Sequence, residues 1–159
     1  MTATSYNIAL VTHIVGITIM AGTTFIDFIT FRAFSRALKA DKDKSLVLEN
    51  YLYQLQRFLG IGMLIILASG ITMMVKLHAV WGAQLWFRIK MGILLLIIIN
   101  GLGLRRRMGS RLKRALPTIL SNNSIDKQWH RIKINFLIVQ SVQMLLFIII
   151  YILSVFKFA

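Results

Sequence analysis

The chain has 159 residues, of which 57% are hydrophobic, and its mean hydropathy of +0.73 is too high for an ordinary soluble domain. A formal net charge of +14 would suggest nucleic-acid binding in a soluble protein, but here the charges are concentrated in gaps between apolar runs. The absence of cysteine excludes disulfides, thiolate chemistry and sulfur-rich metal sites.

Four apolar runs, near residues 6–31, 58–77, 86–104 and 134–156, fill most of the chain. Each approaches or exceeds the ~18–20 residues with which a helix crosses ~30 Å of hydrocarbon. The runs are uniformly apolar and do not alternate in polarity, which favours helices over barrel strands. We therefore predict a single all-α domain over residues 1–159: a polytopic membrane protein with four transmembrane helices in an up-down bundle.

Lysine and arginine are distributed unevenly between the gaps. Fifteen of the 19 lie between the first and second runs or between the third and fourth, and the other four lie at the opposite side. This asymmetry predicts basic loops in the cytoplasm and both termini outside, as in a protein of the bacterial inner membrane. Topology and anionic headgroups explain the charges, so we expect the lipid bilayer as a partner and no nucleic acid. A homo-oligomer remains an open alternative.

The first run carries two ionisable residues, His13 and Asp27, on one helical stripe that also includes Met20. Lipid cannot satisfy such side chains, so the stripe should face the bundle interior. Asp27 lies near the cytoplasmic end within reach of Arg57 or Arg105, and its expected role is an ion pair. His13 lies roughly 10 Å below the outer boundary, where an imidazole either donates a hydrogen bond to a neighbouring helix or ligates a metal or haem.

Segment 41–56 is interpreted as a cytoplasmic extension of the second helix, and a short outer loop is expected at 77–85. The depth of His13 corresponds to about 71–74 on this helix, which places His78 several ångströms too shallow to face it. The second ligand of a shared site would then be His78, on an inward-folded helix end, or a closer group. The closer alternatives are water and the side chains of Met73 and Met74.

The third run opens with Trp86-Phe87-Arg88-Ile89-Lys90. Lys90 either extends to the outer headgroups or turns inward at the level of His13, where it would meet an anionic group such as a haem propionate. Deeper amide side chains are expected to hold the helices together: Asn100, Asn135, Gln140 and Gln143. The stretch 117–127, which begins with the only proline, is expected to be a turn-rich surface segment.

Three features in chain order suggest a family: a histidine followed by small residues from His13 to Gly22, a glycine-started run from Gly60 to Met73, and a tryptophan-containing loop that leads into Trp86-Phe-Arg-Ile-Lys90-Met. In this order they resemble the four-helix proteins related to HemJ-type protoporphyrinogen oxidase, the membrane part of copper-resistance D proteins, and relatives of similar length.

The resemblance implies a b-type haem within the bundle. In the oxidase branch a first-helix histidine and a lysine that starts the third helix are functional, and they match His13 and Lys90. That branch has a tryptophan after the histidine and a Leu-Pro-Arg element ending the first helix, where this chain has Ile19–Gly22 and Phe25–Phe28. The resemblance therefore implies the fold and the cofactor more than the oxidation of protoporphyrinogen.

The leading hypothesis is a haem b-binding membrane protein with redox or electron-transfer chemistry on a quinone or porphyrin, so a membrane oxidoreductase is one outcome. His13 would be an axial and metal ligand, with His78, Met73 or Met74 as the second, and Lys90 with Arg88 would neutralise the propionates. One alternative is a metal (copper) uptake or small transport module without haem, which would use His13, Met20 and Asp27. Another is a structural or assembly protein whose polar residues only tie helices together.

Overall fold

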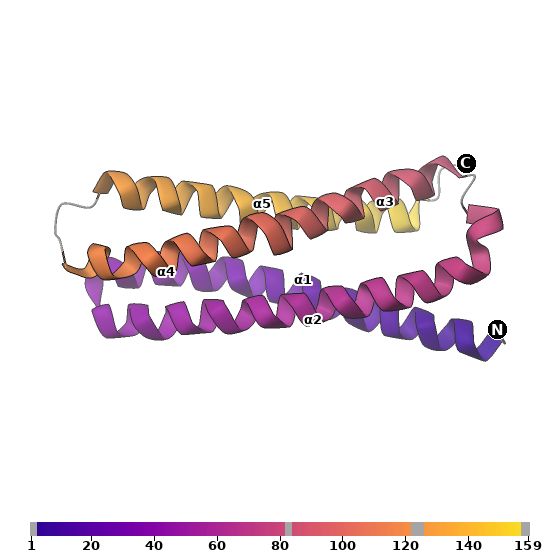
Figure 1. The fold of residues 1–159 in the computed structure, drawn as a ribbon, viewed down its shortest axis with the longest axis horizontal. Helices are drawn as coiled ribbons and strands as arrows, with labels where there is room; N and C mark the ends of the chain where they lie inside the picture. Colours follow the sequence, from indigo (N-terminus) through magenta and orange to yellow (C-terminus); the bar gives the residue numbers. More distant parts are fainter. Residues whose placement is uncertain (1–2, 82–83, 122–125, 157–159) are drawn as a thin grey trace.

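The computed structural model describes residues 3–81, 84–121 and 126–156, and side chains are not described for residues 3, 39, 42, 76–81, 120–121 and 126–128. Helix α1 spans Ala3–Ala40 and α2 spans Lys42–Trp81. Helix α3 (Leu85–Ile98) continues through a π-helical segment, η1 (Ile99–Leu104), into α4 (Arg105–Ser121). Helix α5 spans Asp126–Val155. Because α3, η1 and α4 form one long rod, the molecule is a bundle of four rods (Figure 1).

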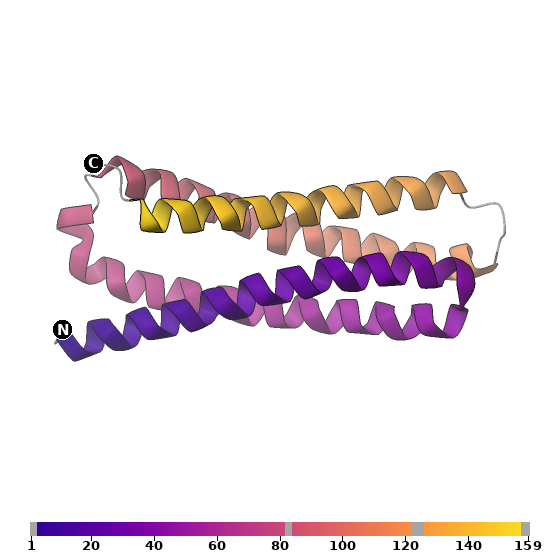
Figure 2. The same cartoon turned by 180° about the vertical axis from the view of Figure 1, so that it is seen from behind.

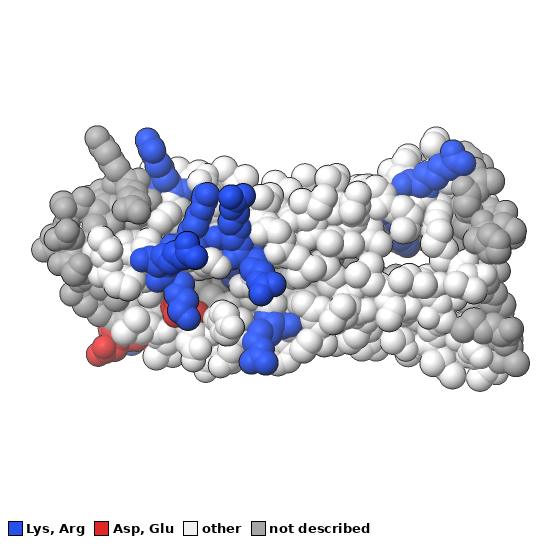
Figure 3. Space-filling model, viewed as in Figure 1, with Lys and Arg blue, Asp and Glu red and all other residues white. Residues whose placement is uncertain are grey.

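Successive rods run in opposite directions (Figures 1 and 2). The start of α1, the end of α5 and the α2–α3 connection lie at one end, here termed the terminal end. The α1–α2 turn and the α4–α5 connection lie at the other, termed the basic end because most of the Lys and Arg side chains visible in Figure 3 gather toward it. The up-down order that the sequence predicts is confirmed.

Four helices are long and apolar enough to cross a membrane: Thr4–Leu38, Asp43–Val75, Leu85–Ile119 and Trp129–Val155. Their outward faces are apolar, with Leu64, Ile71 and Val75 each more than 60% exposed. In water such a continuous apolar surface would promote aggregation, whereas lipid solvates it. The predicted all-α membrane bundle is therefore confirmed.

The helices are longer than the apolar runs that predicted them. Helix α2 begins at Lys42, as expected, but it continues to Trp81, so the connection to α3 is shorter than the predicted 77–85 loop. The region after residue 104, interpreted as a gap between helices, is the helix α4, and Pro117 lies inside it. Leu112 and Leu116, one turn apart on α4, are buried. Packing of this pair stabilises a helix that the polar composition of α4 did not indicate.

A single residue separates α1 from α2. The carboxylate of Asp41 accepts a hydrogen bond from the backbone N–H of Lys44 at 3.2 Å, as an N-cap does, and the Lys44 ammonium lies 3.2 Å from its other oxygen. The backbone amide and then the side chain of Lys44 lower the pKa of Asp41 below its usual value. This stabilisation is present above the unfolded pKa near 3.8 and is lost as the pH falls through the lowered folded value.

Helices α1 and α2 lie in close backbone contact where two glycines face each other's helix. A Cβ on Gly62 would lie 3.1 Å from the backbone nitrogen of Met20 and 3.3 Å from the carbonyl oxygen of Gly16. A Cβ on Gly16 would lie 3.1 Å from the backbone nitrogen of Ile66. Only residues without a side chain permit this spacing, and it holds the face of α1 that carries His13 against α2.

The apolar core consists of two clusters separated along the bundle. The cluster toward the basic end is rich in aromatic rings and comprises Phe31, Phe34, Leu52, Leu112, Leu116, Trp129 and Phe136. The cluster toward the terminal end comprises Met20, Leu59, Met63, Ile66, Ile97 and Phe147. Between the two clusters, α1, the α3–η1–α4 rod and α5 each bury polar side chains, which form a polar layer across the bundle. These side chains are Asp27, Asn100, Arg105, Gln140 and Gln143.

Candidate functional site

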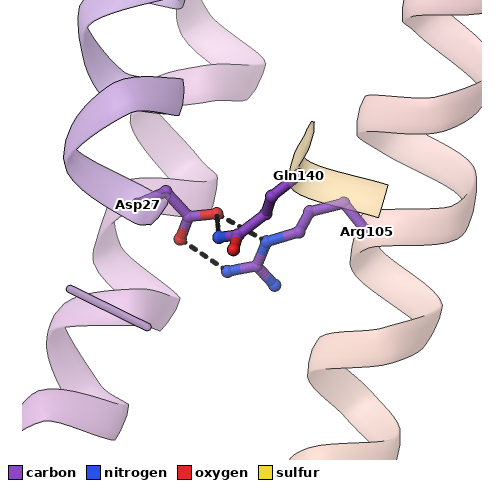
Figure 4. A network of polar contacts seen from close by, with 3 residues as sticks. All are labelled: Asp27, Arg105 and Gln140. Atoms are coloured by element: carbon purple, nitrogen blue, oxygen red, sulfur yellow. Dashed lines mark hydrogen bonds and ion pairs between the residues drawn. The ribbon is translucent and has the colours of Figure 1, made fainter. Parts of the chain in front are cut away.

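The polar layer centres on three side chains from three helices: Asp27 of α1, Arg105 at the start of α4, and Gln140 of α5 (Figure 4). Arg105 donates through Nε to Oδ2 of Asp27 and through Nη2 to Oδ1, each at 2.7 Å. Gln140 Nε2 donates to the same Oδ2 at 2.7 Å. Both carboxylate oxygens of Asp27 are therefore engaged, and the layer joins α1 to the α3–η1–α4 rod and to α5.

This ion pair is almost fully removed from the surroundings, because the Arg105 and Asp27 side chains are only 6% and 5% exposed. The two parallel bonds form the bidentate geometry in which arginine binds a carboxylate most strongly. The guanidinium carbon of Arg105 also lies 4.2 Å from the ring centroid of Phe136. The sequence prediction of an ion pair at Asp27 is confirmed, with Arg105 as the partner, while Arg57 is exposed.

A second set of amides lies beside this centre, where the rod changes from α3 to η1. Asn100 Nδ2 donates to the carbonyl oxygen of Val139 at 2.9 Å and to Oε1 of Gln143 at 2.7 Å. These bonds confirm that Asn100 and Gln143 hold helices together, whereas Asn135 is exposed. Short π segments within α-helices are frequent at functional sites, and this one lies directly before Arg105.

Two buried amide atoms of the layer are not used by the described part of the protein. Oε1 of Gln140 and Nε2 of Gln143 have no hydrogen-bond partner there, although both side chains are at most 3% exposed. One is an acceptor and the other a donor, and they lie three residues apart on α5. The layer thus keeps unmatched hydrogen-bonding capacity, which native interiors retain at few positions.

The other candidate site is His13, toward the terminal end. Its ring lies against α2, where Nδ1 is 2.9 Å from Oγ of Ser69 and 3.2 Å from the carbonyl oxygen of Ile66. A Cβ on Gly70 would lie 3.5 Å from Cε1 of the ring, so the absence of a side chain there makes room for the imidazole. The small residues Ser69 and Gly70 of α2 therefore form the surface against which the His13 ring packs.

The hydrogen bonds around His13 decide its tautomer. A carbonyl oxygen can only accept, and the hydroxyl of Ser69 is already placed to donate to the carbonyl oxygen of Ile65 at 2.6 Å. We therefore assign the ring proton to Nδ1, which donates to both groups. The other nitrogen, Nε2, then carries a lone pair, which is the form of histidine that ligates metals.

The structure places the remaining predicted ligands at different depths. His13 is level with Ile66–Gly70 rather than with 71–74, because α1 and α2 cross at Gly16 and Gly62 and set their register there. His78, whose side chain lies outside the described set, is eight residues beyond Gly70, about 12 Å along the helix axis. Met73 is buried and lies one turn from Ser69 on the same face, whereas Met74 is exposed.

The two predicted cations of α3 differ in placement. Lys90 is half-buried, whereas Arg88 is exposed. Positions two residues apart on a helix point to opposite sides, so one site cannot take both of them from the same face.

The polar stripe of α1 does not form one metal centre. His13 and Asp27 are 14 residues apart, about 21 Å along α1, and Met20 between them is 1% exposed and belongs to the apolar core. In the described part of the chain no three His, Cys, Asp or Glu residues are grouped so that they could hold a metal ion.

The sequence did not indicate Gln140 as the third member of the Asp27–Arg105 centre. It marked this residue only as one of four amide side chains expected to hold the helices together, which was the available signal. Comparison with known proteins adds no relative: no family model matches the chain, and no curated protein or solved structure matches it significantly. The fold and the two candidate sites define the class of this protein: it is a four-helix membrane bundle with a buried Asp–Arg–Gln layer and an oriented histidine.

Proposed function

We propose that the protein binds haem b within the terminal-end half of the bundle and takes part in redox or electron transfer with a quinone or porphyrin in a bacterial inner membrane. The observation that carries this proposal is the orientation of His13. A ligating histidine characteristically donates its second ring N–H to a carbonyl or similar group, which fixes its tautomer and its angle. Ile66 and Ser69 supply that bond here.

The surroundings of His13 are compatible with a large ligand. Among the residues that the structure describes, α2 and α3 are not a helix pair in substantial contact. Figure 3 shows the surface hollowed between the two helix pairs toward the terminal end. The bundle thus separates on the side where His13, the buried Met73 and the half-buried Lys90 occur.

Each of these side chains has a distinct role in the proposal. His13 ligates through Nε2, and Met73 is favoured over Met74 and the more distant His78 as the second ligand because it is buried one turn from Ser69. Lys90 supplies a cation for a propionate, and Arg88 faces outward. A bound haem would supply one-electron redox chemistry, with its potential set by the ligands and by the hydrogen bond to His13.

The test is a reduced-minus-oxidised absorption spectrum of protein purified from cells grown with ample haem precursor. We expect a Soret and α-band change for the wild-type protein, and loss of that change in His13→Ala. His130→Ala is the matched control, because His130 is exposed near the basic end and should leave the spectrum unchanged. A wild-type protein without any Soret change would refute the proposal.

Ser69→Ala separates orientation from ligation. It removes the hydroxyl partner of Nδ1 but keeps His13, so the haem should remain bound with a shifted reduction potential. An unchanged potential would show that the Ser69 contact does not tune a ligand.

One observation favours a second candidate, a structural or assembly role. The contact of His13 with α2 and the Asp27–Arg105–Gln140 layer both tie helices together, which a non-catalytic bundle also needs. In that case His13→Ala would lower thermal stability without any change in cofactor content. The transport alternative receives no such support, because both oxygens of Asp27 are already bonded to protein groups.

A further inference from the structure

A groove of about 390 Å³ opens between α2 and α4 toward the basic end. Its floor includes Arg105 and Phe136, so it lies directly beside the buried ion pair. His13 lies far from this groove, toward the terminal end of the bundle. None of the residues of the proposed haem site lines the groove.

The charge of the groove is strongly positive. Its walls carry Arg57, Arg106 and Lys113 in addition to Arg105, and the only acid among its lining residues is Glu49. Asp27 neutralises Arg105, which leaves three cations against one carboxylate. In the described part of the chain neither Arg57 nor Arg106 makes an ion pair. Figure 3 shows basic side chains gathered over this part of the bundle, toward the basic end.

Two glycines keep the groove open. A Cβ on Gly60 would meet nothing within 4 Å, so the α2 wall is recessed at that point. A Cβ on Gly109 would lie 3.2 Å from Nη1 of Arg105 and 3.3 Å from Oε1 of Gln56. Nη1 is the terminal nitrogen that Arg105 does not use for Asp27, and it therefore lies on the groove side of the guanidinium.

The membrane-facing side of the groove is apolar. Leu102 is a lining residue and is 41% exposed, and Ile61, one helical turn beyond the lining residue Arg57, is 50% exposed. A soluble anion would make no favourable contact with these apolar surfaces. A phospholipid has both parts that this arrangement fits, a phosphate for the cations and acyl chains for the apolar flank.

We propose that the α2–α4 groove is a specific site for the headgroup of an anionic phospholipid from the leaflet that borders the basic end. Arg57, Arg106 and Lys113 contact the phosphate, and Nη1 of Arg105 adds a donor at the base of the groove. The acyl chains lie along Ile61 and Leu102.

Native mass spectrometry of the full-length protein with phosphatidylglycerol or phosphatidylcholine tests the site. We expect retention of phosphatidylglycerol over phosphatidylcholine. Arg57→Gln with Arg106→Gln should weaken phosphatidylglycerol binding roughly thirty-fold, from the contribution of two basic residues near an anionic headgroup. The control pair Arg36→Gln with Arg107→Gln removes the same charge from exposed positions outside the groove and should change binding little.

A second pair of variants blocks the groove without altering charge. Gly60→Leu places a side chain in the groove, whereas Gly22→Leu places one in open space on α1. Only Gly60→Leu should reduce retention. Equal losses in both charge pairs would overturn the proposal in favour of a diffuse charge effect. Displacement of the lipid by millimolar inorganic phosphate would overturn it in favour of a soluble anion.

Discussion

Asp27 and Arg105 show how a charge can be kept inside an apolar bundle. Either side chain alone would be an unpaired charge inside the apolar bundle. Such charges are so unfavourable that they are rare in membrane helices. Paired bidentately, supported by Gln140 and covered by the ring of Phe136, the two become part of the packing. A buried ion pair adds little net stability over well-packed apolar residues, but breaking it leaves an uncompensated charge.

We therefore predict that Asp27→Asn destabilises the protein by about 3–5 kcal/mol, because Arg105 remains buried without its counter-charge. The measurement is denaturant unfolding in detergent micelles, followed by helical circular dichroism. Arg106→Gln, at the next and exposed position, serves as the control and should change stability little.

The double variant Asp27→Leu with Arg105→Met checks the cause. Removing both charges together should restore most of the lost stability, since no unpaired ion remains. If the double variant were as unstable as Asp27→Asn, the loss would come from packing and not from the buried charge.

At the scale of elements, the α1–α2 hairpin is the most extensively packed part of the bundle. Its register depends on Gly16 and Gly62, where backbone meets backbone, and on the one-residue turn at Asp41. The same register sets His13 against Ser69. The position of Asp27 relative to Arg105 and Gln140 depends instead on how α1 packs against α4 and α5.

Gly62→Ala should push α1 and α2 apart, because the added Cβ would lie 3.1 Å from a backbone nitrogen that cannot move alone. We expect a loss of about 1–3 kcal/mol, typical of overpacking. The matched substitution Gly22→Ala meets nothing within 4 Å and should leave stability unchanged or slightly raised. Thermal unfolding of both variants in the same detergent makes the comparison, and equal behaviour would contradict the close-contact account.

For the whole molecule, the distribution of charge and the direction of the helices agree. The start of α1 and the end of α5 lie at the same end of the bundle, opposite the end where most of the visible Lys and Arg side chains gather (Figures 1 and 3). In a membrane whose inner leaflet is anionic, this polarity favours the basic end inside.

Single cysteines can report this orientation, since the chain has no cysteine of its own. We expect Thr4→Cys, at the terminal end, to react with a membrane-impermeant maleimide on intact cells. Ser110→Cys, exposed toward the basic end, should react only after the membrane is opened. The reverse pattern would contradict the positive-inside orientation, and labelling of both from one side would contradict the spanning bundle.

By itself the sequence determined the membrane class, the number of crossings and the inward face of α1. These follow from hydropathy, length and the cost of ionisable groups in lipid, which act on each segment independently. The pairing of Asp27 with a nearby basic residue also followed, because an unpaired charge is so unfavourable there. The helical state of 105–121 did not follow, since it depends on burial of Leu112 and Leu116 against other helices.

Only the tertiary structure decided which groups meet. It selected Arg105 over Arg57, added Gln140 to the pair, and set His13 level with Ile66–Gly70 instead of 71–74. These outcomes depend on the register between helices, which is fixed by side-chain volume at contacts such as Gly16 and Gly62. A shift of one residue along a helix moves a side chain by about 1.5 Å and rotates it by about 100°. Periodicity within one segment carries no information on that offset.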